Sequence, residues 1–566
     1  MAAPERRWNG WGYLGEAFVL PPASSAWLAA RLPAGDPLPA VDESDVVVPD
    51  PRPLPALPVP AATEPAIRLR NACGQSFPDL VALRTGRLLA CPDAVVEPEN
   101  TAQVVAVLEA AARHRIAIVV RGGGTGVVGG VTVPPRPGPV VVVSLGRLRG
   151  LHALDRHSQL ATFLAGTTGP EVEAALAGSG LRLGHEPQSF ELSTVGGWVA
   201  TRSAGQRSTG VGKIDDLVAG VEVATARGTW RLAPQPASAA GPELRRLVIG
   251  SEGRLGVITA ATLRVRARPA AERGTVVLLP SWVEGLACCR ELVQSGVPVE
   301  VMRLSDPDET AFATTLVELP RLAARASRLL FATRRFAGGC ALLLGWTGSD
   351  AEIAGARRGA RAVWRRHGGF AVGGSGYRRW LRERFRHPYL RDALLAAGWG
   401  VDTFETAAPW HVLPALHGAV RGALDRAATA CGLGLAVLCH LSHAYPDGAS
   451  LYFTMFWPLR RDREVSDWRE LKRAATSALL SAGGTLSHHH GVGTMHAPFL
   501  TQEIGEPGVA ALRAAVRALD PEGILNPGVL LVDEPGFRLS DPGPRTPDPG
   551  FRSPVPGSRS PGREGV

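Results

Sequence analysis

Three glycine-bearing segments within one β-rich region constrain the fold of this chain most strongly. They span 121–126 (RGGGTG), 188–205 (with ELSTVGG and TRSAG) and 250–258 (GSEGRLGVI). Glycines have no Cβ, so successive backbone N–H groups can converge on one point and bind phosphate oxygens. The first segment is not a Walker loop, because no Lys-Ser/Thr follows it. It is not a Rossmann turn either, because no helix opens after it.

The surrounding pattern predicts an α+β fold. We expect a helix capped by Asn100 or Thr101 and ending near Arg115, a buried strand at 116–120, the glycine loop, and a strand at 139–145. Strand-like runs and helical stretches rich in Ala, Leu and Arg then alternate over 270–480, which indicates a second α+β unit.

Proline content and the strand and helix pattern suggest the domain limits, although no composition break separates 481–533 from the residues before it. Hydrophobic residues make up 45% of the 566 residues, which is typical of a globular protein. We predict an N-terminal segment (1–32), a proline-rich linker rather than a packed unit (33–66), a nucleotide-binding domain (67–270), a substrate or cap domain (271–480), a C-terminal segment completing the active site (481–533) and a disordered tail (534–566).

Charge and cysteine usage narrow the function classes. The net charge of +9 is diffuse, without basic runs, so it argues against a nucleic-acid partner, although it suits anionic ligands or an anionic membrane surface. The seven cysteines are scattered and include no CxxC pair, which argues against a disulfide framework or zinc ribbon and favours a reducing compartment. No apolar run reaches the length of a membrane span, so we expect a soluble or peripheral protein.

The three glycine segments together resemble the FAD-binding domain of the vanillyl-alcohol oxidase and p-cresol methylhydroxylase type family. The resemblance covers about 85–270 and implies a two-part FAD-binding domain with an α+β substrate (cap) domain. No histidine lies in 121–130, so we expect noncovalent FAD, while a link from the second domain stays open. The implied cofactor residues are Val120, Arg121, Gly122, Gly123, Gly124, Thr125, Gly126, Gln188, Ser189, Phe190, Glu191, Leu192, Ser193, Thr194, Thr201, Arg202, Ser203, Ala204, Glu252, Gly253, Arg254, Leu255, Gly256, Val257 and Ile258.

Four further stretches resemble the alkyldihydroxyacetone phosphate synthase family: 8–13 (WNGWGY), 388–392 (PYLRD), 402–410 (DTFETAAPW) and 487–493 (SHHHGVG). The resemblance implies exchange of the acyl group of acyl-dihydroxyacetone phosphate for a long-chain fatty alcohol. In that family the exchange runs through a flavin N5 adduct and produces an ether lipid without net redox change.

Carried over by motif, Tyr452 is the expected acid/base, Arg391 the substrate-anchoring cation, and His488, His489 and His490 the polar cluster at the reacting centre. Each has a plainer interpretation. A tyrosine in the run LYFTMFW ordinarily packs across strands, and most of the 59 arginines are surface charges. Adjacent histidines are harder to explain by packing, because a strand or turn points them to different faces.

The alternative is an FAD-dependent 2-hydroxyacid dehydrogenase of the D-lactate or glycolate type, to which 524–528 (ILNPG) also bears a resemblance. The metal-binding histidine and glutamate of many such enzymes are replaced here by Leu451 or Tyr452 and by His489, so we expect no metal site of that kind. An all-nitrogen zinc site made by His440, His443 and the three histidines stays open, as does a catalytically silent flavin-binding protein.

The resemblance also sets expectations for partners and location. Its lipid substrates imply peripheral attachment to a membrane surface, and a homodimer stays open. The chain ends in Arg-Glu-Gly-Val, which is not a peroxisomal signal, and its arginine bias favours a bacterial cytoplasmic enzyme; a truncated eukaryotic, peroxisomal sequence is the alternative.

Overall fold

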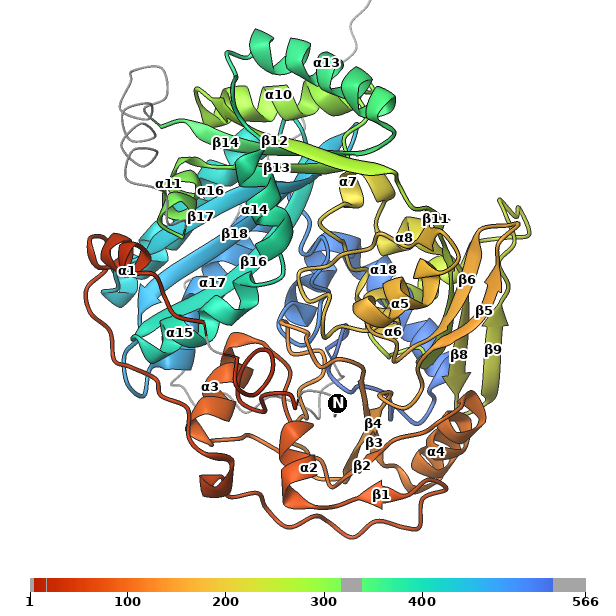
Figure 1. Cartoon of the computed structure of the whole chain (residues 1–566). Coiled ribbons are helices and arrows are strands. Elements are labelled where there is room, and N and C mark those ends of the chain that lie inside the picture. Colours follow the sequence, from red (N-terminus) through yellow and green to blue (C-terminus); the bar gives the residue numbers. More distant parts are fainter. Residues whose placement is uncertain (1–4, 17, 317–337, 533–566) are drawn as a thin grey trace, which may run out of the picture. The chain divides into compact units, whose positions relative to one another are not determined.

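Strands of the first half form two sheets and a short pair. The computed structural model of the chain describes residues 5–16, 18–316 and 338–532, so the predicted tail 534–566 lies outside the described residues. One sheet has the order β1 (Ala61–Ala62), β2 (Ala94–Val96), β4 (Val140–Ser144), β3 (Ala117–Arg121), and the other the order β5 (Leu151–Asp155), β6 (Leu160–Leu164), β10 (Val257–Arg264), β8 (Val218–Thr225), β9 (Gly228–Leu232). A short pair, β7 (Leu181–Arg182) and β11 (Arg266–Ala267), lies beside them (Figure 1).

The helix that precedes the glycine loop forms as predicted. Helix α4 (Thr101–His114) begins after Asn100, whose side chain accepts the backbone N–H of Gln103, and ends at Arg115 in the left-handed conformation (φ 53°). Strand β3 follows and pairs in parallel with β4, which places the glycine loop at the carboxyl end of β3. The remaining helices of this half are α2 (Pro65–Arg70), α3 (Phe77–Thr85), α5 (Gly169–Ala177), α6 (Val195–Thr201), α7 (Ser208–Val211), α8 (Ile214–Leu217) and α9 (Leu244–Val248).

The second half is built on an antiparallel sheet, called here the cap sheet. Its strand order is β15 (Phe370–Gly373), β12 (Ala271–Leu279), β14 (Cys340–Gly348), β13 (Val301–Ser305), β17 (Ala436–Ala444), β18 (Gly448–Pro458), β16 (Trp399–Pro409). Alternate residues of a strand point to opposite faces. Accordingly Leu451, Phe453 and Met455 of β18 are buried in the main hydrophobic core, whereas Tyr452, Thr454 and Phe456 line a cavity.

Helices cover both faces of the cap sheet (Figure 1). Those on the core face are α10 (Trp282–Gln294), α13 (Asp350–Arg366), α16 (Leu413–Cys431) and α17 (Glu464–Ser481). Helices α11 (Pro307–Thr315), α14 (Ser375–Glu383) and α15 (Leu390–Ala396) contribute residues to the cavity on the other face. None of the described helices combines the length and the apolar character that crossing a bilayer requires.

The proline-rich stretch 33–66 is not the free linker that the sequence predicts. It is mostly extended, but Leu38 is buried in the main core and Val59 in the core of the first half. Its strand β1 pairs with β2, and the backbone N–H of Asp36 donates to the Leu459 carbonyl. Proline fixes an extended backbone without preventing apolar side chains from packing. Helix α1 (Pro22–Ala29) precedes this stretch.

The C-terminal segment returns to the first half. Helix α18 (Leu500–Leu519) has a kink at Gly505, and the chain then makes a parallel bridge from Leu525 to Ile118 of β3. This contact brings residues after 520 beside the glycine loop. The seven cysteines are all unpaired.

Candidate active site

A cavity of about 1200 Å³ lies between the glycine loop and the cap sheet. It exceeds the roughly 300–1,000 Å³ of most small-molecule sites, so it has room for a dinucleotide and a second ligand. Many predicted cofactor residues line it, drawn from all three glycine segments: Val120, Gly122, Gly123, Gly124, Thr125, Gly126, Gln188, Ser189, Ser193, Thr194, Thr201, Ser203, Ala204, Glu252, Gly253, Gly256 and Ile258.

The glycine loop packs so closely on the second segment that side chains are excluded. A Cβ on Gly123 would lie 1.9 Å from the Leu192 carbonyl oxygen, and one on Gly122 would lie 2.3 Å from Thr194 Oγ1. Gly124 has φ +65°, which also favours glycine. Thr194 Oγ1 is buried without a hydrogen-bond partner among the described residues. A glycine cradle beside an unpaired hydroxyl at the cavity wall fits the phosphates of a dinucleotide such as FAD.

The other predicted cofactor residues do not line the cavity. Three arginines bind protein groups instead: Arg121 donates to the Cys73 carbonyl (2.7 Å), Arg202 to Asp215 (2.7 Å) and Arg254 to the Leu525 carbonyl (2.7 Å). Phe190 stacks on Phe385, Tyr389 donates to Glu191 (3.4 Å), and Leu192, Leu255 and Val257 are buried in hydrophobic clusters. Motif matching selected whole segments, whereas only some of their residues face the cavity.

Asn526 is a cavity residue without a predicted role. Its side-chain oxygen accepts the Val120 backbone N–H (3.0 Å), and its Nδ2 donates to the Glu252 carbonyl (2.7 Å). It thereby joins the strand before the glycine loop to the third glycine segment. The only signal for Asn526 in the sequence is the ILNPG stretch (524–528), which resembles the 2-hydroxyacid dehydrogenases.

Tyr452 lies on the cavity face of β18, where it contacts several imidazoles. Its ring stacks on His440 (centroids 4.9 Å apart) and on His489 (5.9 Å), and it meets His490 edge-on (5.5 Å). Burial raises the pKa of the Tyr452 phenol to about 12. The phenol is therefore protonated at neutral pH and sits among neutral rings.

His440 is held by charged side chains of the cap domain. Its Nδ1 lies 2.9 Å from the Glu309 carboxylate and 3.2 Å from the Arg303 guanidinium, and all three residues line the cavity. Burial opposes ionisation of Glu309, but His440 and Arg303 lower the pKa of this carboxyl to about 2. No motif in the sequence points to Arg303 or Glu309.

Residues 487–493, called here the histidine segment, are anchored by a buried glutamate. Glu405 of β16 accepts the backbone N–H groups of His488, His489 (3.1 Å) and His490 (2.8 Å), and the Ser487 hydroxyl (2.8 Å). Burial opposes its ionisation, yet the three histidines and these N–H groups hold the pKa of Glu405 well below its usual range. Glu405 lies in a stretch singled out by resemblance (402–410), but no role was predicted for it.

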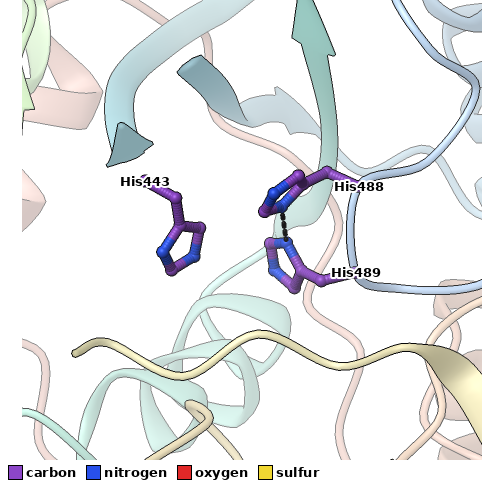
Figure 2. Close-up of side chains that lie close together, drawn as sticks. All are labelled: His443, His488 and His489. Atoms are coloured by element: carbon purple, nitrogen blue, oxygen red, sulfur yellow. Dashed lines mark hydrogen bonds between the residues drawn. The ribbon is translucent and has the colours of Figure 1, made fainter. Parts of the chain in front are cut away.

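Only two of the three histidines of this segment line the cavity. His489 and His490 line the cavity, as does His443 of β17, whereas His488 does not. His488 accepts or donates at both ring nitrogens: Nε2 lies 2.7 Å from the Tyr445 hydroxyl and Nδ1 3.0 Å from His489 Nδ1. Figure 2 shows the second of these hydrogen bonds beside His443. Burial lowers the pKa of His489 to about 3 and that of His488 well below its usual range, so both rings are neutral.

Arg391 also faces the cavity, and its orientation is fixed by Gln75. Two of its nitrogens donate to the Gln75 carbonyl (2.9 Å) and to Gln75 Oε1 (2.6 Å), while its buried Nε has no hydrogen-bond partner among the described residues. Trp11 of the WNGWGY stretch lies against the guanidinium (5.5 Å) and donates its backbone N–H to Asp392 (2.9 Å). Two motifs far apart in the sequence thus meet at the cavity.

The histidine cluster has the spacing of possible metal ligands. Ligand atoms of His443, His488 and His489 lie within 4.8 Å of one another, as do those of Glu405, His489 and His490. The Nδ1 atoms of His488 and His489 are already hydrogen-bonded to each other, and Glu405 already accepts several N–H groups. These partners favour a hydrogen-bonded cluster over a metal centre.

Comparisons with known proteins agree with this geometry. Residues 92–233 match the family described as FAD binding domain, and 268–530 match FAD linked oxidases, C-terminal domain. An alkyldihydroxyacetonephosphate synthase of Trypanosoma brucei brucei is 30% identical over 479 residues, which cover 83% of this chain and 78% of that protein. The Dictyostelium discoideum protein of the same name is 28% identical and covers 82% and 77%. A solved alkyldihydroxyacetonephosphate synthase superimposes with a TM-score of 0.80 at 25% identity, covering 92% of this chain and 98% of that one.

Proposed function

Since the chain belongs to the alkyldihydroxyacetonephosphate synthase family, as the sequence motifs predicted, we propose that it is an alkylglycerone-phosphate synthase. It replaces the acyl group of acyl-dihydroxyacetone phosphate with a long-chain fatty alcohol to form an ether lipid. The observation that carries this assignment is one cavity whose wall contains the glycine segments on one side and Tyr452, His489, His490 and Arg391 on the other. Both matched families are FAD proteins, so FAD is the cofactor.

The side chains divide the chemical work. When bound, FAD would supply the electron-rich centre that the exchange at the ester-bearing substrate carbon requires. Tyr452 carries a proton at an atom facing the cavity, and moves it to and from that carbon as a general acid/base. His489 and His490 are neutral hydrogen-bonding groups that bind the leaving carboxylate and the entering hydroxyl.

Arg391 is the proposed anchor for the anionic substrate. A guanidinium binds phosphate and carboxylate through several N–H donors, and Gln75 fixes which of those donors remain for the ligand. The proximity of Trp11 places an aromatic face against the cation. Burial lowers the Arg391 pKa, and an anion would compensate the buried charge.

Apolar residues support a lipid substrate. Beyond Tyr452 the cavity continues along the cap sheet, where its wall consists largely of aliphatic and aromatic side chains: Leu278, Phe312, Leu343, Leu394, Val401, Leu438 and Phe456. A long alkyl chain gains free energy in proportion to the apolar area that it buries there. A small 2-hydroxyacid has no use for such a surface.

The proposal extends to the state and place of the enzyme. FAD is held noncovalently, in keeping with the absence of histidine from 121–130, so denaturing the protein should release the flavin into solution. The enzyme works in the cytoplasm at a membrane surface, where its substrates are found; its unpaired cysteines suit a reducing compartment. The homodimer stays a prediction, to be tested by light scattering.

A paired assay tests the function. Purified holoprotein given acyl-dihydroxyacetone phosphate and hexadecanol should release fatty acid and yield the ether product. Reduction of a dye by D-lactate or glycolate, with no ether product, would establish the dehydrogenase alternative instead. Flavin binding without either activity would indicate a silent flavoprotein, and stoichiometric zinc in the active preparation would contradict the metal-free site.

A further inference from the structure

A chain of hydrogen bonds runs from the cavity wall to a surface turn. It begins at His489, which lines the cavity. The Nδ1 of His489 lies 3.0 Å from Nδ1 of His488 (Figure 2), and His488 Nε2 lies 2.7 Å from the Tyr445 hydroxyl. Tyr445 is half-buried in the turn between β17 and β18, and the next two residues, Pro446 and Asp447, are exposed. The chain therefore links the cavity to a half-buried side chain in a surface turn.

The hydrogen-bond pattern fixes the protons within this chain. Two nitrogens 3.0 Å apart must share one proton, so only one of the two Nδ1 atoms carries a hydrogen. If it is on His489, then His489 Nε2 carries no hydrogen, and His488 Nε2 carries the hydrogen donated to the Tyr445 oxygen. If it is on His488, every donor and acceptor is reversed. The two arrangements interconvert when one proton passes along the chain.

The proposed reaction requires such a path. An ester and an alcohol give an ether, a carboxylate and one proton, which comes from the alcohol hydroxyl. FAD and two long chains occupy the cavity during this step, so water has limited access to the reacting centre. A conducted proton needs neutral, hydrogen-bonded groups that each accept one proton as they release another.

We infer that Tyr445, His488 and His489 form a proton relay that exports the alcohol proton from the cavity to solvent. This inference rests on the proposed function. The proton enters at His489 Nε2, the Nδ1 hydrogen of His489 passes to His488 Nδ1, the Nε2 hydrogen of His488 passes to the Tyr445 oxygen, and the original Tyr445 hydrogen passes to water. One proton enters and one leaves, and each group ends with the charge that it had. His489 contacts the reactants, while His488 and Tyr445 act through it.

Other features hold the relay in place. The backbone N–H groups of His488 and His489 are bound to Glu405, and Lys213 donates from Nζ to the His488 carbonyl oxygen. The His443 ring stacks on His488, with centroids 5.1 Å apart. The rings therefore keep the orientation that the two hydrogen bonds require.

The test compares Tyr445→Phe, His488→Gln and the double variant as FAD-loaded enzymes. Ether formation and proton release are followed together, the latter with an indicator dye. Each single variant should lower kcat by about 10²-fold with little change in KM. The double variant should be no slower than the slower single variant, because one interruption already breaks the relay. Imidazole buffer should partly restore the turnover of Tyr445→Phe and leave that of the wild type unchanged.

Tyr377→Phe is the matched control, because it also removes a tyrosine hydroxyl, which is bonded to Glu272 (2.6 Å), and Tyr377 does not line the cavity. The turnover of this variant should equal that of the wild type. Flavin absorbance and melting temperature show whether each variant folds. If His488→Gln does not fold, Tyr445→Phe alone tests the relay. Wild-type kcat in Tyr445→Phe, or losses that multiply in the double variant, would overturn the relay. If the wild type makes no ether at all, the proposed function has failed instead.

Discussion

Glu252 and Glu405 bind the same segment from two different domains. Glu405, on the cap sheet, accepts the backbone N–H groups of His488 to His490, and Glu252, in the third glycine segment, accepts those of Val492 (2.6 Å) and Gly493 (2.8 Å). Both carboxyl groups are buried, with 2% and 6% exposure for Glu405 and Glu252. The position of the histidines thus depends on carboxyl groups from both halves of the chain.

Replacing Glu405 should loosen the histidine segment. In Glu405→Gln, an amide NH2 takes the place of one acceptor oxygen and faces backbone N–H donors. We expect a loss of about 3 kcal/mol in the free energy of unfolding and a loss of most turnover. Because folding lowers this pKa below 4.5, the contribution of Glu405 is present above pH 4.5 and is lost as pH falls. Chemical denaturation at pH 7 measures the difference in the free energy of unfolding between Glu405→Gln and the wild type.

The control for this change is Glu503→Gln. Glu503 is exposed and accepts from Thr485 and the backbone N–H of Leu486, near the same segment. Its replacement should cost less than about 1 kcal/mol. Equal losses in the two variants would show that the buried position of Glu405 has no special role.

Glu252 should give the stability of the protein a pH dependence of opposite sign. Burial raises its pKa from 4.5 to about 7, so between these values the folded state binds more protons than the unfolded state. Stability therefore falls as pH rises from 4.5 to 7. In Glu252→Gln this component, on the order of 3 kcal/mol, should disappear. Unfolding curves at pH 5, 6, 7 and 8 give the free energy of unfolding at each pH. If this free energy changes with pH equally in the variant and the wild type, the raised pKa does not belong to Glu252.

Tyr452→Phe separates chemistry from cofactor binding. The ring still stacks on His440 and His489, so flavin absorbance should be unchanged, while turnover should fall about 10²-fold or more without the hydroxyl. Tyr377→Phe again serves as the control. Wild-type turnover in Tyr452→Phe would remove this hydroxyl from the mechanism.

Lysine occurs only at positions 213 and 472, against 59 arginines, and both lysines are bound inside the protein. Lys213 donates to the His488 carbonyl, and Lys472 donates to Asp402 (3.0 Å) and to the Thr403 carbonyl (2.9 Å). An arginine head is wider and carries five donors, so some would be left unpaired there. We expect Lys213→Arg to lower stability by about 1–3 kcal/mol and to reduce turnover, although the charge is kept.

Arg268→Lys, at an exposed position, provides the comparison and should leave stability within about 0.5 kcal/mol of the wild type. Thermal unfolding and turnover of the wild type, Lys213→Arg and Arg268→Lys test this prediction. If Lys213→Arg behaves like Arg268→Lys, the two lysines are retained for reasons unrelated to their fit.

Local signals predicted the first half of the molecule well. Asn100 and the pattern after it predict α4, and the glycines at 122–126 predict a loop, in which Gly122 and Gly123 leave no room for a Cβ. The roles of Tyr452 and Arg391 came only from resemblance, because a tyrosine in an apolar strand and one arginine among many carry no local signal. Their position in the cavity is what the structure adds.

Long-range partners could not be predicted in the same way. Glu405, Asn526 and Gln75 each act on a residue at least 80 positions away, and that separation is closed only by the fold. A signal did exist for Glu405, which is one of two carboxylates, with Asp402, in a largely buried strand. Such a residue needs a buried partner, but the sequence does not say which one.

The alternation along β18 also limits how this site can change. Tyr452, Thr454 and Phe456 face the cavity, and each is flanked by residues of the main core. A substitution at one of these positions alters the cavity alone, whereas inserting or deleting one residue would turn Tyr452 into the core and expose Phe453 to the substrate. New substrate preferences in relatives should therefore arise from replacements at even-numbered positions of this strand, at constant strand length.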